Sequence, residues 1–150
     1  MEKIKNFIEN FCSLEKIDFN SIHKVGRKYF YFNKQILDLK NRINKGIFSA
    51  GLFLGEDRQE FKPSLALLEM LSSHSTKKIF VNKEAEWLFT CGRDVFQKSI
   101  IKLDVDSGLV LVQNEQDENL GYGRIIKGNK IFIKNILDKG NYLRCENKGK

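Results

Sequence analysis

The residue types that most often perform catalysis are few in this sequence, and none forms an active-site pattern. The two histidines, His23 and His74, lie in polar segments that predict turns. Cys91 and His74 could act as nucleophile and base only if folding brought them together, and the residues around Cys91 show no nucleophile elbow. The acids near 104–106 and 115–118 also fall in predicted turns, where carboxylates are normally solvated. We therefore expect a protein that is not an enzyme.

Motifs that hold metals or cofactors are also missing from the sequence. Cys12, Cys91 and Cys145 are far apart and form no C-x-x-C pair. The acidic segment at 55–60 lacks the spacing of a calcium loop, and no glycine-rich phosphate loop occurs. We expect no metal, no cofactor and no small-molecule substrate. Three unpaired cysteines favour the reducing cytoplasm, or the nucleus or nucleolus if the source is eukaryotic.

The more informative residues are cations placed beside aromatic rings on predicted strands. In "KIFIKN", the alternation of a strand puts Lys130, Phe132 and Lys134 on one face. A ring between two lysines suits stacking with a nucleic-acid base and contact with phosphates. The alternative is that Phe132 packs beneath a loop and the lysine stems cover it. The segment "TKKIFVNK" repeats the pattern, with Lys78 and Phe80 on one side and Ile79 and Val81 on the other.

The net charge supports a polyanionic partner. The 150 residues include 26 Lys and Arg against 19 Asp and Glu, a formal charge of +7. Up to Ser75 the chain holds 12 basic and 9 acidic residues, and after it 14 and 10. Nucleic acid is the first expectation, and an anionic membrane surface is the second. Because neither half is a basic tail, folding must gather the cations onto one side. No run approaches the roughly 20 apolar residues of a membrane helix, and the amino terminus does not read as a signal peptide.

One strand carries an unusual glycine pair, in "ENLGYGRIIKGNK". Alternation predicts Leu120, Tyr122, Arg124 and Ile126 on one face, and a face left bare by two glycines on the other. Bare backbone allows a helix, another strand or a ligand to approach closely, or allows a barrel strand to bend. These alternatives remain open, and in each of them Tyr122 and Arg124 are presented on the opposite face.

The elements that must position these residues fall into two groups. The first half predicts mixed α/β structure, with helices at 3–15, 34–44 and 65–73, the last of them capped by Ser64. It also predicts a hairpin turning at Gly26 and strands on either side of the turn "GEDR". A polar stretch, "SSHSTKK", marks the candidate boundary. The second half predicts a compact barrel with one embedded helix at 83–90, capped by Asn82, and strands within 78–81, 99–105, 108–114, 119–126 and 130–135.

Motifs along both halves resemble known families. The helix start at Lys83–Glu86, then "GRDVFQKSI", "LGYGR" and "KGNYLR", resemble in order the PUA domain, a small RNA-binding pseudo-barrel named for pseudouridine synthases and archaeosine transglycosylases. The segments "YFYFNKQILDLKNRI" and "IFSAGLFLGEDRQEFKPSLALLEML" are similar to the amino-terminal domain of the Nip-seven family of ribosome-assembly proteins, with Phe61 and Lys62 at a characteristic strand end. The resemblance implies an α+β chain, with a pre-PUA α/β domain at 1–74 and a PUA pseudo-barrel at 75–150.

This resemblance implies a non-catalytic factor in large-subunit ribosome biogenesis and ribosomal RNA processing, whose partners are ribosomal RNA and other assembly proteins. The alternatives are an RNA-binding specificity subunit of a pseudouridine synthase or transfer-RNA methyltransferase, and a protein scaffold whose charge aids solubility. The resemblance places RNA contacts on Arg93, Lys98, Arg124, Arg144 and Lys148. With the cations of neighbouring strands, the candidate RNA-binding residues are Lys77, Lys78, Arg93, Lys98, Arg124, Lys127, Arg144 and Lys148.

Overall fold

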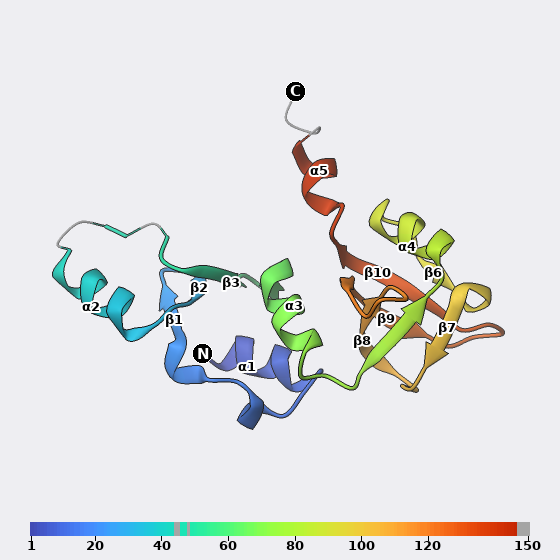
Figure 1. Cartoon of the computed structure of the whole chain (residues 1–150), viewed down its shortest axis with the longest axis horizontal. Coiled ribbons are helices and arrows are strands. Elements are labelled where there is room, and N and C mark those ends of the chain that lie inside the picture. Colours follow the sequence, from blue (N-terminus) through green and yellow to red (C-terminus); the bar gives the residue numbers. More distant parts are fainter. Residues whose placement is uncertain (44–45, 48, 147–150) are drawn as a thin grey trace.

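Two antiparallel-rich sheets, one in each half of the chain, form the framework of the computed structural model (Figure 1). The structure describes residues 1–43, 46, 47 and 49–146. The first sheet has the order β1-β2-β3-β4 and is accompanied by three helices. The bounds in this half are α1 (Glu2–Glu9), β1 (Ile22–Val25), β2 (Lys28–Tyr31), α2 (Lys34–Arg42), β3 (Leu52–Asp57), β4 (Phe61–Pro63) and α3 (Leu65–Ser72).

The second sheet is a nearly closed pseudo-barrel with the order β6-β10-β9-β8-β5-β7. All its described pairings are antiparallel except that of β5 with β8. Val81, Phe89, Val110, Val112 and Ile133 fill its interior. The bounds here are β5 (Lys78–Val81), α4 (Lys83–Thr90), β6 (Val95–Phe96), β7 (Ile100–Leu103), β8 (Gly108–Gln113), β9 (Asn119–Ile126), β10 (Phe132–Asp138) and α5 (Asn141–Glu146).

Side chains at the helix starts explain where three of these helices begin. Asn33, Ser64 and Asn82 each accept a hydrogen bond from the backbone N–H three residues later, at Ile36, Leu67 and Ala85. Such caps stabilise a helix by about 1 kcal/mol each. The predicted caps at Ser64 and Asn82 are therefore confirmed. None of the helices within the described ranges is long and apolar enough to cross a membrane.

Two predicted helices differ from the observed ones. The helix predicted over 3–15 ends at Glu9, because the Asn10 side chain donates to the carbonyls of Asn6 and Phe7 and competes with continuation of the helix. The helix predicted over 34–44 forms as α2, but its apolar stripe is not buried. Leu39 remains 58 % exposed, since α2 lies at the far end of the molecule from the barrel (Figure 1).

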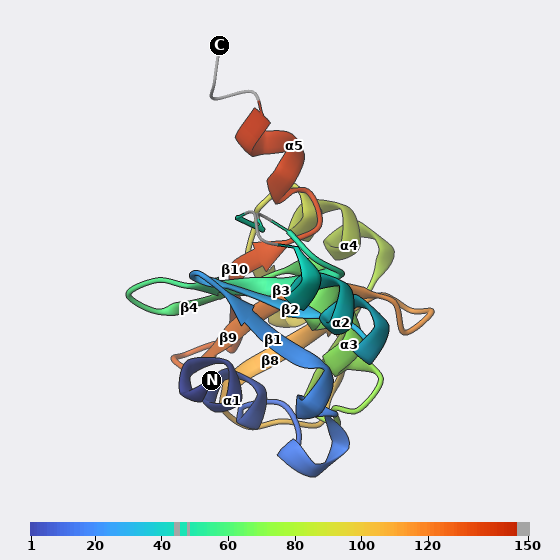
Figure 2. The same ribbon diagram turned by 90° about the vertical axis from the view of Figure 1, so that its left-hand side faces the viewer.

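The two sheets are joined by a shared core. In Figure 1, α1 and α3 lie between the first sheet and the barrel, and Figure 2 shows the same helices behind and below the first sheet. The core packs α1 and α3 residues such as Ile8 and Leu68 with Leu111 and Tyr122 from the barrel. The Tyr122 ring makes edge contacts with Phe7 and Phe11, at centroid distances of 5.5 and 6.1 Å. The segment that connects α3 to β5 is also held to the first half, because Ser75 Oγ donates to the Phe11 carbonyl at 2.8 Å.

Tyr122 therefore corrects the prediction made for the glycine strand. It is only 7 % exposed and is covered by α1, so it is not a surface residue. Leu120 belongs to the barrel interior, so it does not share a face with Tyr122. The alternation breaks at Gly121, where φ is +145° and the pairing of β8 with β9 shifts by one residue.

The bare face of the glycines accommodates the backbone of another strand, β10. A Cβ on Gly121 would collide with the Leu137 carbonyl oxygen, and one on Gly123 would lie 2.5 Å from that of Lys134. Opposite them β10 contains a bulge, with Ile136 as the additional residue between the partners of Gly123 and Tyr122. The glycines are structural: they let a bulged strand lie against β9.

Candidate nucleic-acid interface

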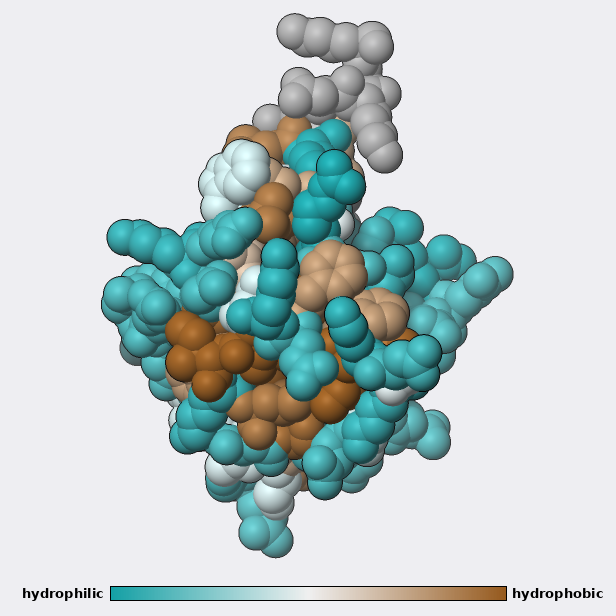
Figure 3. All heavy atoms as spheres, turned by 90° about the vertical axis from the view of Figure 1, so that its right-hand side faces the viewer, coloured by the Kyte–Doolittle hydropathy of each residue, from teal (hydrophilic) through white to brown (hydrophobic). Residues whose placement is uncertain are grey.

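Two neighbouring phenylalanines, one exposed and one half-buried, lie at the barrel end of the molecule. Phe96 on β6 and Phe132 on β10 are register partners, with ring centroids 6.4 Å apart. Phe96 is 60 % exposed and Phe132 is half-buried. Ile133, the next residue on β10, points into the core, so the predicted facing of Phe132 is confirmed. Figure 3 faces this end and shows apolar side chains gathered in a band with hydrophilic ones around it.

A groove beside these rings brings two of the predicted cations together. Arg93 and Lys98 line a cavity of about 330 Å³ between α4 and β6, and Phe96 forms part of the same wall. Glu84 and Asp94 also line it. The Asp94 carboxylate accepts the backbone N–H of Asn135 and lies 3.6 Å from Lys134, so it serves to join this loop to β10.

The turn between β9 and β10, which leads into Phe132, adds two more cations. Lys127 and Lys130 are exposed, and Ile131 in the same turn donates its N–H to Gln97 Oε1 at 3.4 Å, which ties the turn to the segment after β6. We call the set Arg93, Phe96, Lys98, Lys127, Lys130 and Phe132 the barrel-end surface. The four cations of this surface form no ion pair with any residue in the described ranges, so they are available to an anionic ligand.

Arg124 lies apart from this surface but on the same outer side of the sheet. It is exposed on β9 directly opposite Lys134 of β10, two residues from Ile126, which pairs with Phe132. Its guanidinium has no ion-pair partner among the described residues. Two like charges placed opposite each other across a ladder repel. Because Lys134 is paired with Asp94 at 3.6 Å, Arg124 is the cation of the two that is available to an anion.

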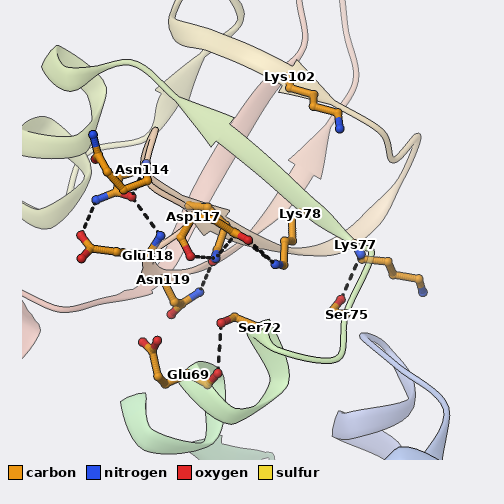
Figure 4. Close-up of polar contacts among 12 residues, drawn as sticks. Glu69, Ser72, Ser75, Lys77, Lys78, Lys102, Asn114, Asp117, Glu118 and Asn119 are labelled. Carbon is orange, nitrogen blue, oxygen red and sulfur yellow. Dashed lines mark hydrogen bonds and ion pairs between the residues drawn. The ribbon is translucent and has the colours of Figure 1, made fainter.

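Lys77 and Lys78 lie elsewhere, where the chain enters β5 (Figure 4). Lys78 Nζ is bound to both carboxylate oxygens of Asp117, at 3.0 and 3.1 Å. A hydrogen bond from Gln113 lowers the pKa of Asp117, and the Lys78 ammonium lowers it further, so the carboxylate stays charged. Lys77 is exposed, and its backbone N–H donates to Ser75 Oγ. The structure does not bring this pair to the barrel-end surface.

Arg144 is held in a structural clamp. Its guanidinium donates to both carboxylate oxygens of Asp138, at 2.6 and 3.0 Å, and to the Thr90 carbonyl at the end of α4. Asp138 is only 2 % exposed. The clamp fixes α5 to the ends of α4 and β10, which leaves Arg144 little capacity for an external phosphate. Lys148 lies outside the described residues.

Sequence reasoning missed three features of this region. Phe96 was not singled out, although it occupies the middle of "GRDVFQKSI" and alternates outward from the buried Val95. The Arg144–Asp138 pair has no signal at the sequence level, because its partners lie on a helix and a strand joined by a turn. The opening of Ile136 to the surface depends on the β10 bulge. Within the described residues, no group of three or more His, Cys, Asp and Glu side chains could hold a metal ion.

Residues 77–147 match the model of the UPF0113 PUA domain. That span contains all the strands of the barrel and all six residues of the barrel-end surface. A curated relative, the UPF0113 protein of Archaeoglobus fulgidus, is 33 % identical over 106 residues, which cover 63 % of this chain. The match spans 61 % of that relative's length.

A solved structure extends the likeness to both halves of the fold. It is a conserved PUA domain protein from Thermoplasma acidophilum, which is 16 % identical and has a TM-score of 0.56. The comparison covers 95 % of this chain and 90 % of that one. At this level of identity, the likeness shows a common fold.

Proposed function

We propose that the protein is a non-catalytic RNA-binding factor that acts in biogenesis of the large ribosomal subunit. The PUA domain matched by residues 77–147 is generally an RNA-binding domain. The observation that carries the proposal is the barrel-end surface, where four cations without an ion pair among the described residues accompany the exposed Phe96 ring and the half-buried Phe132 ring. Cations bind phosphates and rings stack on unpaired bases, so this surface is suited to single-stranded RNA.

The proposed contact set is narrower than the one drawn from the sequence. It keeps Arg93, Lys98, Lys127 and Arg124, and adds Lys130 and the rings of Phe96 and Phe132. It leaves out Lys78 and Arg144, because each is bound to a carboxylate within the fold. Lys77 and Lys148 have no proposed contact.

The ribosomal part of the proposal rests on the resemblance of the first half to the Nip-seven family. Under this proposal the partners are ribosomal RNA and other assembly proteins, and the protein acts in the cytoplasm, or in the nucleolus or nucleus of a eukaryote. Exposed apolar side chains on the first half are available to partner proteins: Tyr31, Leu39, Ile43 and Leu52.

Crosslinking in cells followed by sequencing of the bound RNA tests this function. A tagged full-length chain should recover precursors of the large-subunit ribosomal RNA and should sediment with large-subunit precursors. A variant with Arg93→Ala and Lys98→Ala should lose most of this signal. Recovery of transfer RNA together with a modifying enzyme would instead support the role of a specificity subunit. Recovery of no RNA above background would contradict both readings.

A further inference from the structure

A second groove lies between the two halves of the molecule, away from the barrel-end surface. It has a volume of about 440 Å³ and runs between α1 with the β3–β4 turn on one side and β8, β9 and β10 on the other. We call it the central groove, and its principal lining residues are Asn6, Gln59, Phe61, Tyr122, Arg124 and Ile136. Lys3 on α1 holds α1 against the β3–β4 turn, because it donates to the Arg58 carbonyl at 2.6 Å and pairs with Asp57 at 2.8 Å.

The Tyr122 hydroxyl is the polar group that points to a ligand. The residue is more than nine-tenths buried, and its ring is fixed by Phe7 and Phe11. The hydroxyl forms no hydrogen bond with any residue in the described ranges. In those ranges every fully buried side-chain N or O atom has a hydrogen-bond partner, so the Tyr122 oxygen must be in contact with solvent. Because the ring lines the central groove, its oxygen must open into that groove. Burial raises the pKa of Tyr122 to about 12, so at neutral pH the hydroxyl is a protonated donor.

The groove also offers flat apolar walls and free amides. The β10 bulge brings Ile136 to the surface, where it is 44 % exposed, opposite the half-buried Phe61. The side-chain amides of Asn6 and Gln59 have no hydrogen-bond partner among the described residues. A mainly apolar slot with a few converging donors and acceptors is the usual form of a small-ligand site. An unpaired nucleobase fits this description, since it has two apolar faces and a polar edge.

Arg124 supplies the charge that distinguishes a nucleotide from an uncharged ligand. It lines the central groove, and Lys134 lies directly opposite it on β10. Glu60 is the acidic residue that lines the groove, and its charge raises the pKa of Tyr122 while that of Arg124 lowers it. A peptide added as a strand needs a free sheet edge. β8 and β9 have neighbours on both sides, but β4 is an edge strand and β6 pairs only with Phe132 and Ile133 of β10. The feature that favours a nucleotide is the charge of Arg124 beside the apolar walls, because a nucleotide supplies both a flat base and a phosphate.

We propose that the central groove binds one unpaired nucleotide of the RNA that the barrel-end surface holds. The base lies between Ile136 and Phe61, the Tyr122 hydroxyl donates to its edge, and Arg124 binds its phosphate. Tyr122, Arg124 and Ile126 follow one another along the outer side of β9, about 7 Å apart at the rise of a strand. Since Ile126 pairs with Phe132, a single strand can continue from the groove to the exposed rings. This inference rests on the proposed function.

Removing one oxygen atom tests the inference. Tyr122→Phe keeps the ring packing, and Tyr142→Phe removes a hydroxyl from an exposed position on α5 as a matched control. Affinity for a short fluorescent oligouridylate should fall roughly 3–10-fold in Tyr122→Phe, as expected for one hydrogen bond, with thermal midpoint and salt dependence unchanged. Tyr142→Phe should bind like the wild type. Arg124→Gln should weaken binding and also lower the salt slope by about 0.7.

Photo-crosslinking with the same oligonucleotide carrying 4-thiouridine separates the two proposals. The inference predicts crosslinks within residues 59–61 and at Tyr122 and Ile136, in addition to those at Arg124 and at the barrel end. If Tyr122→Phe binds like the wild type and crosslinks fall only within 93–98 and 124–134, the inference is wrong and the proposed function stands. If the wild-type chain binds no RNA, both are wrong.

Discussion

The glycine pair of β9 makes the sharpest prediction about the fold. In Gly121→Ala the new Cβ would have to overlap the Leu137 carbonyl and lie 2.8 Å from the Asp138 Cα, both of which are backbone atoms that cannot rotate away. The φ of +145° adds strain of about 1–3 kcal/mol for a residue with a side chain. Overpacking against a backbone adds about 1–3 kcal/mol more. The expected loss of unfolding free energy is therefore about 3 kcal/mol or more.

Gly128→Ala is the matched control, because no atom lies within 4 Å of the Cβ that it would add. Its free energy of unfolding should stay within about 0.5 kcal/mol of the wild type. Urea unfolding measures both variants. With a slope of about 1–3 kcal/mol per molar urea, the Gly121→Ala midpoint should fall by about 1 M or more. Equal midpoints for the two variants would refute the assignment of Gly121 to close contact with the β10 bulge.

Two further predictions concern charges within the fold. Arg144→Ala should lower the unfolding free energy by about 2–3 kcal/mol, which is no more than the usual cost of breaking a buried pair, because Arg144 is partly exposed. The RNA affinity of the folded protein should not change. A large loss of affinity with intact stability would show that Arg144 contacts RNA instead. The second prediction concerns Asp57. Hydrogen bonds from Lys24 and Lys3 lower the pKa of its carboxyl from 3.8 to about 2. The charged carboxylate therefore stabilises the fold above pH 4, and this stabilisation is lost as the pH falls towards 2. In thermal unfolding, Asp57→Asn should therefore be less stable than the wild type at neutral pH, and this difference should disappear near pH 2. A difference in stability that persists at pH 2 would contradict the assignment to the charged Asp57 carboxylate.

Local patterns in the sequence predicted most elements of the fold. The caps at Ser64 and Asn82, the hairpin at Gly26 and the outward facing of Phe132 depend on residues close in the chain, and the structure has all of them. The mixed helix and strand content and the pseudo-barrel are also as predicted. The division at residue 74 stays a prediction, and Leu111 and Tyr122 show that the packing core crosses it.

The features that escaped prediction depend on contacts between distant segments. Alternation assigned Tyr122 to a face of β9, but it could not show that α1 covers that face. The β10 bulge, which exposes Ile136 and forms a wall of the central groove, leaves no mark in the local pattern. Net charge likewise could not show which cations are neutralised by carboxylates. Lys78 and Arg144 are, and the cations of the barrel-end surface are not.

The salt dependence of RNA binding tests the barrel-end surface most directly. The double variant Arg93→Ala/Lys98→Ala can be compared with Lys34→Ala/Arg42→Ala, which removes the same charge from α2 at the opposite end. For single-stranded RNA each phosphate contact contributes about 0.7 to the slope of log affinity against log salt. The first variant should lose about 1.4 in slope and bind more weakly, and the second should match the wild type. Equal effects of the two variants would show that binding follows net charge alone and would contradict a defined surface.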